Sequence, residues 1–254
     1  VILISITNVG AQHLGTYGYY RNTSPNIDKF AEESIVFENA FSPASWTLPA
    51  GISLFTSLYP YTHGVMNRFN ENKLNPNTIT LVDVLKENGY KTAAFTGGFD
   101  YSSKFGLINR FDVISSGSEH VTEENPNNTV KGIGSLVSSA PVALDWIKNN
   151  QDKKFFLFLQ GYDTHCPFNP PEPYNRLFAD SQGLDNVNIL ASECIRGYKA
   201  EKGDKKYVAY YSTRGRDAYS EEPLELYESD IKYLESQYDG EIAYVDNFLG
   251  GFFD

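Results

Sequence analysis

The sequence predicts an α/β fold with a mainly parallel sheet. Short apolar runs alternate along the chain with segments whose apolar residues recur at helical spacing. The runs "VILISI" and "FFLFL" are strongly apolar, which is typical of strands covered on both faces. Because strands that alternate with helices assemble into parallel sheets, these two observations together indicate the fold class.

The first predicted elements follow the opening strand at residues 1–6. Residues 24–34 predict a helix, because Ser24 suits an N-cap and the apolar residues that follow share one face. Residues 35–41, "IVFENAF", are typical of a short strand. Residues 49–59, "PAGISLFTSLY", predict the next helix.

The second group of elements continues the alternation. A Thr near the start and a Gly near the end delimit a predicted helix in "TITLVDVLKENGY", residues 78–90. The other predicted elements are a strand at 91–98, a helix at 140–150, a strand at 153–163 and a long helix over 222–254.

Two polar segments interrupt this alternation. Residues 115–135 are rich in Ser, Gly, Asn and Glu and predict a loop. Residues 180–222 contain "KGDKK" and "TRGRD" and predict a polar insertion, which could serve as a lid or an interface. The chain has no internal repeat, so we expect a single domain over residues 1–254.

The charge of the chain restricts its partners. The net charge is −11 at neutral pH, which argues against nucleic acid and anionic membrane surfaces. It is compatible with a small anionic substrate, because a helix N-terminus or a metal ion can bind an anion locally. The sequence does not indicate an oligomeric state.

The cellular compartment is left open by the sequence. No run approaches the roughly 20 apolar residues of a membrane span. The chain opens on a strand, without Met or a signal peptide, which is compatible with a cytoplasmic or a processed secreted protein. Two cysteines, Cys166 and Cys194, are too few for a disulfide framework, but a single bridge between them stays open.

The stretch "SWTLPAGISLF" places Thr47 where a helix begins. One interpretation is that Thr47 caps this helix, because Thr is a common N-cap and Pro is tolerated in the first turn. The other is that Thr47 is a nucleophile or substrate ligand at the helix N-terminus, where free N–H groups and the helix dipole favour an anion. The stretch by itself favours the cap.

Seven blocks of the chain occur in the order found in one enzyme family. They are "VILISITNVGAQHLGTYGY", "NTSPNIDKFAEESIVFENAFS", "WTLPAGISLFTSLYPYTHGV", "LVDVLKENGYKTAAFTGG", "FGLINRFDVI", "FFLFLQGYDTHCPFNPPEPYNRLF" and "YDGEIAYVDNFLG". Together they resemble the N-terminal portion of a sulfatase of the alkaline-phosphatase superfamily. The resemblance implies a three-layer α/β/α sandwich that hydrolyses sulfate esters or related phosphate and phosphonate esters. It also implies a divalent cation, commonly calcium, bound by acidic residues at the strand ends.

The nucleophile position departs from the family pattern. In sulfatases the nucleophile is a formylglycine made from Cys or Ser in a C/S-x-P-x-R motif, and in phosphodiesterase and phosphonate-hydrolase relatives it can be Thr. Residue by residue, Thr47 falls on the nucleophile and Gly51 falls on the Arg. No formylglycine is expected, because oxidation of the secondary alcohol of Thr would give a ketone.

The expected metal site departs further. The family usually carries an Asp, or an Asp pair, directly after the first strand, whereas Thr7 and Asn8 stand there in this chain. Ligand charge is a main determinant of affinity for a hard cation, and these two side chains offer only neutral oxygens. Thr7 and Asn8 are therefore degenerate metal positions.

Other residues complete the candidate site. His165 matches a family His that contacts the anionic group of the substrate, and the alternative is a His bonded to a backbone carbonyl. Asp163 is close enough in sequence to orient His165, or it forms a turn. Arg68 and Lys104 are the nearest basic candidates for substrate binding, with solvated surface charge as their alternative.

Several polar residues are interpreted as structural. His63 is expected to bond to the backbone, with Gly64 at positive φ. His13 is expected to pack and not to catalyse. The carboxylates of the last helix, Asp239 and Asp246 among them, are expected on a solvated face.

Two functions are compatible with these residues. The first is a sulfatase-family hydrolase of a small anionic ester, in which Thr47 attacks sulfur or phosphorus, His165 contacts the substrate and water releases a covalent intermediate. The second is a catalytically degenerate binding or scaffold module, favoured by Gly51 and by the neutral metal positions. The sequence "DHG", which in the family belongs to a second half that completes the metal site, does not occur. The sulfatase-like domain is therefore expected to be incomplete at its C-terminus.

Overall fold

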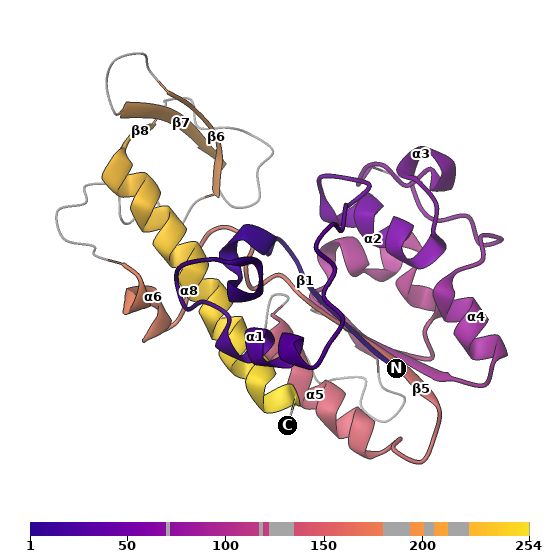
Figure 1. Cartoon of the computed structure of the whole chain (residues 1–254). Coiled ribbons are helices and arrows are strands. Elements are labelled where there is room, and N and C mark those ends of the chain that lie inside the picture. The colour runs from indigo at the N-terminus through magenta and orange to yellow at the C-terminus, as the bar shows by residue number, and fades with distance from the viewer. Residues whose placement is uncertain are drawn as a thin grey trace. The chain divides into compact units, whose positions relative to one another are not determined.

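A computed structural model gives the three-dimensional structure of the chain (Figure 1). It describes residues 1–69, 72–116, 119–121, 135–179, 194–200, 206–212 and 224–253. The chain forms two compact units, unit 1 with residues 1–7 and 37–163 and unit 2 with residues 8–36 and 164–254. Most of the predicted 115–135 loop and most of the predicted 180–222 insertion lie outside the described residues.

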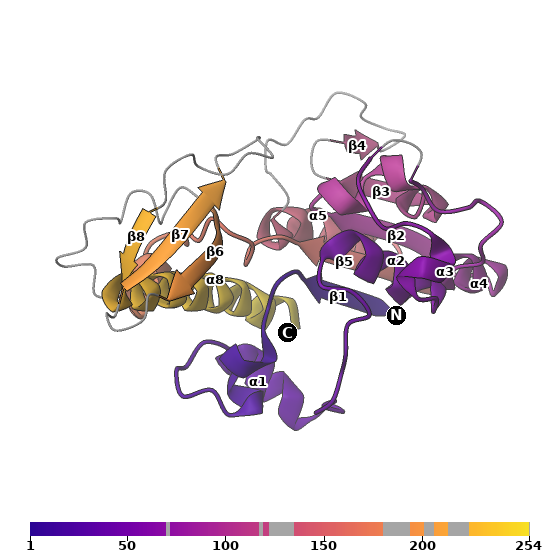
Figure 2. The ribbon, with the colours of Figure 1, turned by 90° about the horizontal axis from the view of Figure 1, so that it is seen from above.

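Unit 1 is built on a five-stranded sheet in the order β1-β5-β2-β3-β4 (Figure 2). Its strands are β1 (Ile2–Ile6), β2 (Lys91–Thr96), β3 (Val113–Ser116), β4 (Glu119–Val121) and β5 (Phe155–Gly161). All neighbouring strands run parallel except β3 and β4, which are antiparallel. The predicted mainly parallel sheet is confirmed.

One face of this sheet is covered by α2 (Thr47–Thr56) and α4 (Leu81–Glu87). Phe55 of α2 lies 5.0 Å from Phe158 and 6.4 Å from Phe156, measured between ring centroids. Phe156, Phe158 and Phe55 are nearly inaccessible to solvent. Because burial of apolar area is the main stabilising term in folding, this aromatic cluster is the core of the layer.

The opposite face is covered by α5 (Leu136–Lys148). Trp146 of α5 lies 6.3 Å from Phe95 of β2 and 5.5 Å from Phe155 of β5. Side chains alternate between the two faces of a strand, so Phe155 points to α5 and Phe156 points to α2. Unit 1 is therefore an α/β/α sandwich, as the sequence predicts.

Most of the predicted strands and helices of the first 163 residues are present, with shifted ends. Helix α4 begins after Thr80, whose side chain forms a capping box with Asp83, and Gly89 follows it at φ 80°. Helix α3 (Pro60–His63) and five 3-10 turns were not predicted. These turns are Ala11–His13, Gly15–Tyr17, Phe99–Tyr101, Ser103–Phe105 and Ile108–Arg110.

The prediction of a strand at residues 35–41 is wrong. This segment is irregular, and Ile35, Phe37 and Phe41 are 85%, 70% and 89% exposed. A β-strand is stable only when a neighbouring strand pairs with its backbone. The β-type composition of "IVFENAF" cannot supply that partner.

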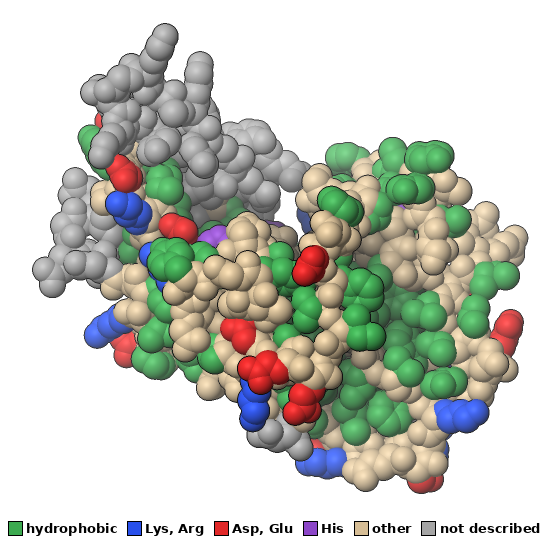
Figure 3. Space-filling view, viewed as in Figure 1, with side chains coloured by type: hydrophobic (Ala, Val, Ile, Leu, Met, Phe, Trp, Pro, Cys, Tyr) green, Lys and Arg blue, Asp and Glu red, His purple; other side chains and the backbone are tan. Residues whose placement is uncertain are grey.

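Exposed apolar side chains also gather over the α2–α3 part of unit 1, where Figure 3 shows hydrophobic surface. They are Leu54, Tyr59, Tyr61, Met66 and Phe69. The rings of Tyr59 and Tyr61 are stacked, with centroids 6.2 Å apart. This part of unit 1 therefore presents apolar and aromatic surface to the solvent.

Among its described residues, unit 2 contains three α-helices, two of the 3-10 turns named above and a three-stranded sheet. Its elements are α1 (Pro25–Glu32), α6 (Tyr174–Leu177), α8 (Glu228–Phe253), β6 (Cys194–Ala200), β7 (Lys206–Ser212) and β8 (Leu224–Tyr227). The strands are antiparallel in the order β6-β7-β8. The predicted insertion therefore contains β6 and β7, and the predicted 115–135 loop contains the end of β3 and the whole of β4. Within the described part of the chain, no helix is long and apolar enough to cross a membrane.

The expectation that the acidic residues of α8 face solvent is wrong for at least four of them. Asp230, Asp239, Glu241 and Asp246 are all less than 9% exposed. The Asp246 carboxylate accepts hydrogen bonds from the backbone N–H groups of Asn26 and Ile27 in the first turn of α1. Burial raises the pKa of Asp246 above its usual value, although these hydrogen bonds lower it. Asp239 and Asp246 are buried because residues 13–27 donate hydrogen bonds to them. Asp230 and Glu241 accept from the backbone N–H groups of Tyr227 and Asn169, and helical periodicity does not reveal these contacts.

We expect Phe158→Ala to lower the free energy of unfolding by about 3–5 kcal/mol, because it removes a ring from a filled core and leaves a cavity. Phe69→Ala is the matched control, since Phe69 is 78% exposed, and it should cost less than about 1 kcal/mol. Urea unfolding followed by tryptophan fluorescence measures both. Equal losses would contradict the assignment of the core.

Candidate functional site

Thr47 is the first residue of α2, and it is half-buried. The N-cap is Trp46, in extended conformation, and no side chain makes the capping hydrogen bond. The interpretation of Thr47 as the cap is therefore wrong, since Thr47 lies one residue inside the helix. A helix start without a side-chain cap leaves backbone N–H groups for solvent or for a ligand, and its dipole favours an anion.

The rest of α2 fixes this helix start in place. Leu48 and Ile52 are each 1% exposed and belong to the aromatic core cluster. Gly51 packs against Tyr101 so closely that a Cβ atom at this position would lie 2.7 Å from the Tyr101 Cζ atom. The family's Arg has no room here, because even its Cβ would overlap the tyrosine ring. The packing of Tyr101 against this position therefore requires the Gly that stands here in place of the family's Arg.

Arg68 and Lys104 lie in one hydrogen-bonded group. The Arg68 guanidinium donates to both carboxylate oxygens of Asp100, at 2.6 and 2.7 Å. The Asp100 side chain is fully buried and that of Arg68 is 59% exposed. Lys104 Nζ donates to the Arg68 carbonyl oxygen at 2.7 Å. These contacts show that neither side chain is only a solvated charge.

Arg68 also lies close to the start of α2. Its guanidinium carbon is 5.2 Å from the centroid of the Trp46 ring, a distance at which cations are attracted to an aromatic face. Trp46 directly precedes Thr47. The structure therefore brings the Arg68 guanidinium close to Trp46, the residue that precedes the helix.

Thr7 lies at the carboxyl end of β1, and its hydroxyl belongs to a hydrogen-bond chain across the sheet. Gln160 Nε2 donates to Thr7 Oγ1 at 2.8 Å, and Gln160 Oε1 accepts from the Gly97 N–H at 3.0 Å. Thr7 is 8% exposed and Gln160 is fully buried. These bonds join the ends of β1, β5 and β2 through neutral groups.

Asn8 belongs to unit 2 and adopts φ 69°, in the left-handed region. Tyr238 of α8 donates from its hydroxyl to the Asn8 carbonyl at 2.6 Å and accepts from the Gly10 N–H at 2.8 Å. Burial raises the pKa of Tyr238, so its hydroxyl stays protonated and can donate. The loop after β1 is thus held by backbone contacts to one side chain of α8.

The same loop makes a second contact with α8 through Asp239, which has no exposed surface. Its carboxylate accepts hydrogen bonds from Tyr19 Oη at 2.7 Å, from Arg21 Nη1 at 2.6 Å and from His13 Nδ1 at 2.7 Å. Burial and the bond to Asp239 raise the pKa of Tyr19. His13 therefore makes a polar contact with α8, and its ring lies 4.9 Å from that of Tyr238 between centroids.

A hard cation does not fit the residues at these strand ends. The Thr7 hydroxyl accepts a hydrogen bond from Gln160, and a hard cation such as calcium prefers several anionic oxygens. The nearest acids in sequence are engaged elsewhere: Asp100 pairs with Arg68. Asp163 accepts from Ser135 Oγ and from the Leu136 N–H at the start of α5. The Asp163 side chain therefore bonds to the start of α5, a long-range contact that the sequence analysis did not predict.

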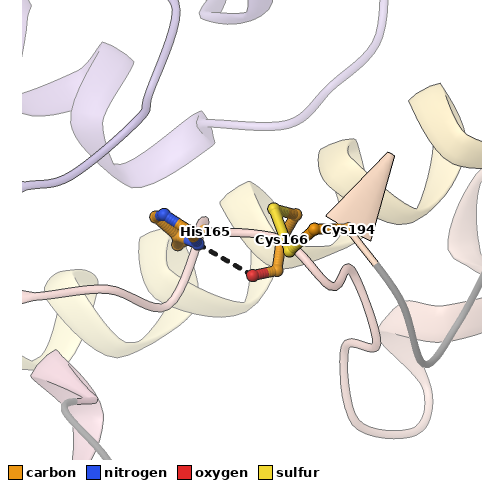
Figure 4. Close-up of a disulfide and its surroundings, with 3 residues drawn as sticks. All are labelled: His165, Cys166 and Cys194. Carbon is orange, nitrogen blue, oxygen red and sulfur yellow. Dashed lines mark hydrogen bonds between the residues drawn. A yellow bond between two sulfur atoms is a disulfide. The ribbon is translucent and has the colours of Figure 1, made fainter. Parts of the chain in front are cut away.

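His165 follows β5 and belongs to unit 2 (Figure 4). Its Nδ1 lies 2.7 Å from the carbonyl oxygen of Cys166. Cys166 forms a disulfide with Cys194, the first residue of β6. The two sequence alternatives, a single bridge and a His bonded to a carbonyl, are both observed.

His63 links α3 to the first turn of α2. Its Nδ1 accepts from the Val65 N–H at 3.1 Å, so Nε2 carries the proton, 3.3 Å from the Pro49 carbonyl oxygen. Gly64 has φ 76°. The structural interpretation of His63 is confirmed.

The predicted site residues fall into two groups. Thr47, Arg68, Lys104 and Thr7 lie in unit 1, whereas Asn8 and His165 lie in unit 2. Sequence reasoning missed other participants, among them Asp100, Trp46, Gln160 and Tyr238. Asp100, Gln160 and Tyr238 bond to predicted residues that are distant in sequence. Trp46 directly precedes Thr47, so its position could have been recognised from the sequence.

The family model described as Sulfatase matches residues 1–254 of the chain. An N-acetylgalactosamine-6-O-sulfatase of Bacteroides thetaiotaomicron is 30% identical over 95 residues, which are 36% of this chain and 19% of that protein. The multifunctional alkaline phosphatase superfamily protein PehA of Trinickia caryophylli is 24% identical over 277 residues, which are 91% of this chain and 53% of that protein. The chain thus spans about half the length of PehA, and less of the other curated relatives that it matches.

Among solved structures, the fold is similar to phosphonate monoester hydrolase of Agrobacterium radiobacter. The TM-score is 0.63 and the identity 20%, and the match covers 99% of this chain and 58% of that chain. At this identity the similarity shows the fold.

We expect Gly51→Ala to lower the free energy of unfolding by about 1–3 kcal/mol, because the added methyl group overpacks against Tyr101. Gly251→Ala in α8 is the control, since a Cβ there meets nothing within 4 Å. It should raise stability by up to about 1 kcal/mol through helix propensity. The proposed close packing is wrong if Gly51→Ala is as stable as the control in urea titrations.

His63 should make stability depend on pH. Burial lowers the pKa of His63 below its ordinary value of 6.5, although the bond to the Pro49 carbonyl raises it. The unfolded chain then binds a proton at higher pH than the folded protein does. The contribution of His63 is complete above about pH 6.5 and falls as the pH drops through the folded pKa.

The measurement is the free energy of unfolding at about pH 7.5 and about pH 5.5. The loss on acidification should be smaller in His63→Gln than in the wild type. Phe69→Ala, which changes no titratable group, should keep the wild-type loss. If His63→Gln loses as much unfolding free energy on acidification as the wild type, the His63 ring is not the source of the pH dependence.

Proposed function

Because the chain belongs to the sulfatase family, we propose that it carries the nucleophile end of a hydrolase for sulfate esters or related phosphate and phosphonate esters. The observation that carries this proposal is the position of Thr47 at the uncapped start of α2, beside Trp46 and Arg68. The substrate class is supported by relatives named as a sulfatase and as a multifunctional alkaline phosphatase superfamily protein.

The unit 1 residues suit the binding of an ester anion. The first N–H groups of α2 and the helix dipole would stabilise the non-bridging oxygens. The Arg68 guanidinium is directed by its two hydrogen bonds to Asp100, and its exposed part can approach a ligand. Charge that develops on the transferring group is best stabilised by such pre-positioned donors.

In the proposed reaction, the Thr47 Oγ atom bonds to the sulfur or phosphorus and the ester oxygen leaves with a proton. Water then cleaves the bond between Thr47 and the transferred group, which restores the threonine. The family correspondence assigns His165 to the substrate anion, and no step of this reaction is assigned to it. A divalent cation would stabilise charge on the transferred group in such enzymes, but Thr7 and Asn8 supply only neutral donors, so no step is assigned to it.

A binding or scaffold module is the second candidate, and it rests on two observations. Gly51 leaves no space for the family's Arg, and the Thr7 hydroxyl is bonded to Gln160. The chain would thus lack the Arg and the metal ligands that speed the reaction in the family. The helix start could still bind an anion. In this case the chain would bind sulfate or phosphate groups without turnover.

The test is hydrolysis of para-nitrophenyl sulfate, phosphate and phenylphosphonate by the purified chain, with and without added divalent metals. We expect Thr47→Ala to lower turnover by at least about 10³-fold, because it removes the nucleophile. Thr47→Ser keeps a hydroxyl and should retain measurable turnover.

Thr56→Ala is the matched control, since Thr56 ends the same helix and its hydroxyl bonds to the Ile52 carbonyl. It should leave turnover unchanged. Full activity in Thr47→Ala would exclude Thr47 as the nucleophile. If the wild type hydrolyses none of the three esters but binds inorganic sulfate or vanadate in calorimetry, the binding module is the function.

A further inference from the structure

One imidazole nitrogen and two cysteine sulfurs lie close together where a disulfide links the segment after β5 to the first residue of β6. His165, Cys166 and Cys194 each offer one donor atom, and these atoms all lie within 4.8 Å of one another. Figure 4 shows the imidazole on one side of Cys166 and the second cysteine on the other. Among the described residues, this is the group of three or more His, Cys, Asp or Glu side chains that reaches such a spacing.

The ring of His165 is held beside the cysteines by a local contact. Its Nδ1 lies 2.7 Å from the Cys166 carbonyl oxygen, so the imidazole is fixed to the same peptide that carries the first sulfur. Cys194 is buried, and His165 and Cys166 are half-buried. The imidazole and the Cys166 sulfur belong to neighbouring residues, whereas Cys194 is held beside them by the disulfide in this structure.

The sulfurs are joined in a disulfide in this structure, and a disulfide has no thiolate that could bind a metal. A dithiol reductant changes this in two exchange steps. The bond between the two Sγ atoms breaks, each sulfur receives one electron and one proton, and the reductant is oxidised to its own disulfide. The product is a pair of thiols beside an imidazole.

We propose that this group is a redox-gated zinc site. The oxidised chain carries the Cys166–Cys194 bond, and the reduced chain binds one zinc ion through His165, Cys166 and Cys194, with water in the fourth position. On binding, the two thiols release their protons to solvent and the imidazole gives a nitrogen lone pair. Its ligands are not the residues of the family's cation position, Thr7 and Asn8, and it shares only His165 with the residues considered for the hydrolase.

Zinc is favoured over calcium by the chemistry of the donors. Thiolate and imidazole are ligands that zinc prefers in tetrahedral sites, whereas calcium binds oxygen atoms. The two states exclude each other, because a sulfur in a disulfide cannot also be a thiolate. The metal would preserve the connection between residues 166 and 194, which are 28 positions apart, after the covalent bond is lost.

The experiment uses the full chain in two forms, oxidised and reduced with a dithiol that is then removed under anaerobic conditions. Zinc is titrated in competition with a chromophoric chelator, and cobalt serves as a spectroscopic substitute. We expect about one zinc per reduced chain and a thiolate-to-cobalt charge-transfer band, with neither in the oxidised chain.

His165→Gln should weaken zinc binding by the reduced chain at least about tenfold, because one ligand is lost. His13→Gln is the matched control, since His13 bonds to Asp239 and lies outside the group. It should leave zinc affinity unchanged.

Three results would overturn the proposal: no cobalt band in the reduced wild type, equal zinc uptake by the two forms, or wild-type affinity in His165→Gln. The first two need no variant, so a folding defect in a mutant cannot obscure them. Because the readout is bound metal and not ester turnover, failure here leaves the hydrolase proposal untouched, and the reverse also holds.

Discussion

Strand β5 is the element on which unit 1 depends. It pairs with β1 on one side and β2 on the other, and its alternate side chains pack against α2 on one face and α5 on the other. Gln160 near its end links the ends of β1 and β2. The position of α2, and with it the start of the helix at Thr47, is set by this packing because Phe55 sits against Phe158.

Unit 2 depends on a different interaction, the bonding of buried carboxylates on α8. Asp239 receives three donors from residues 13–21, and Asp246 binds the first turn of α1. A buried charge is tolerated only when donors surround it, and removal of such donors typically costs several kcal/mol. The long helix therefore organises the N-terminal loop through hydrogen bonds as well as through apolar contacts such as the stacked Phe30 and Phe253.

The fold of the chain is similar to that of a phosphonate monoester hydrolase, and the candidate metal positions at the end of β1, Thr7 and Asn8, carry neutral side chains. The proposed anion site consists of the N-terminus of α2 and Arg68, whose guanidinium donates two hydrogen bonds to Asp100. The packing of Gly51 against Tyr101 shows that the missing Arg is accommodated by the core. A single substitution at that position would not restore the family arrangement.

Apolar periodicity and ordered motifs are local signals, so the α/β class and the strands β1, β2 and β5 could be predicted from the sequence, and the candidate positions Thr47 and His165 follow from the resemblance of the ordered motifs. Only the tertiary structure decided that residues 35–41 form no strand, that the acids of α8 are buried and that Trp46 is the N-cap of α2. It also decided the pairing of Arg68 with Asp100 and of Cys166 with Cys194. These features depend on which distant segments meet in space, and the free energy of such contacts is not encoded in any one stretch of the chain.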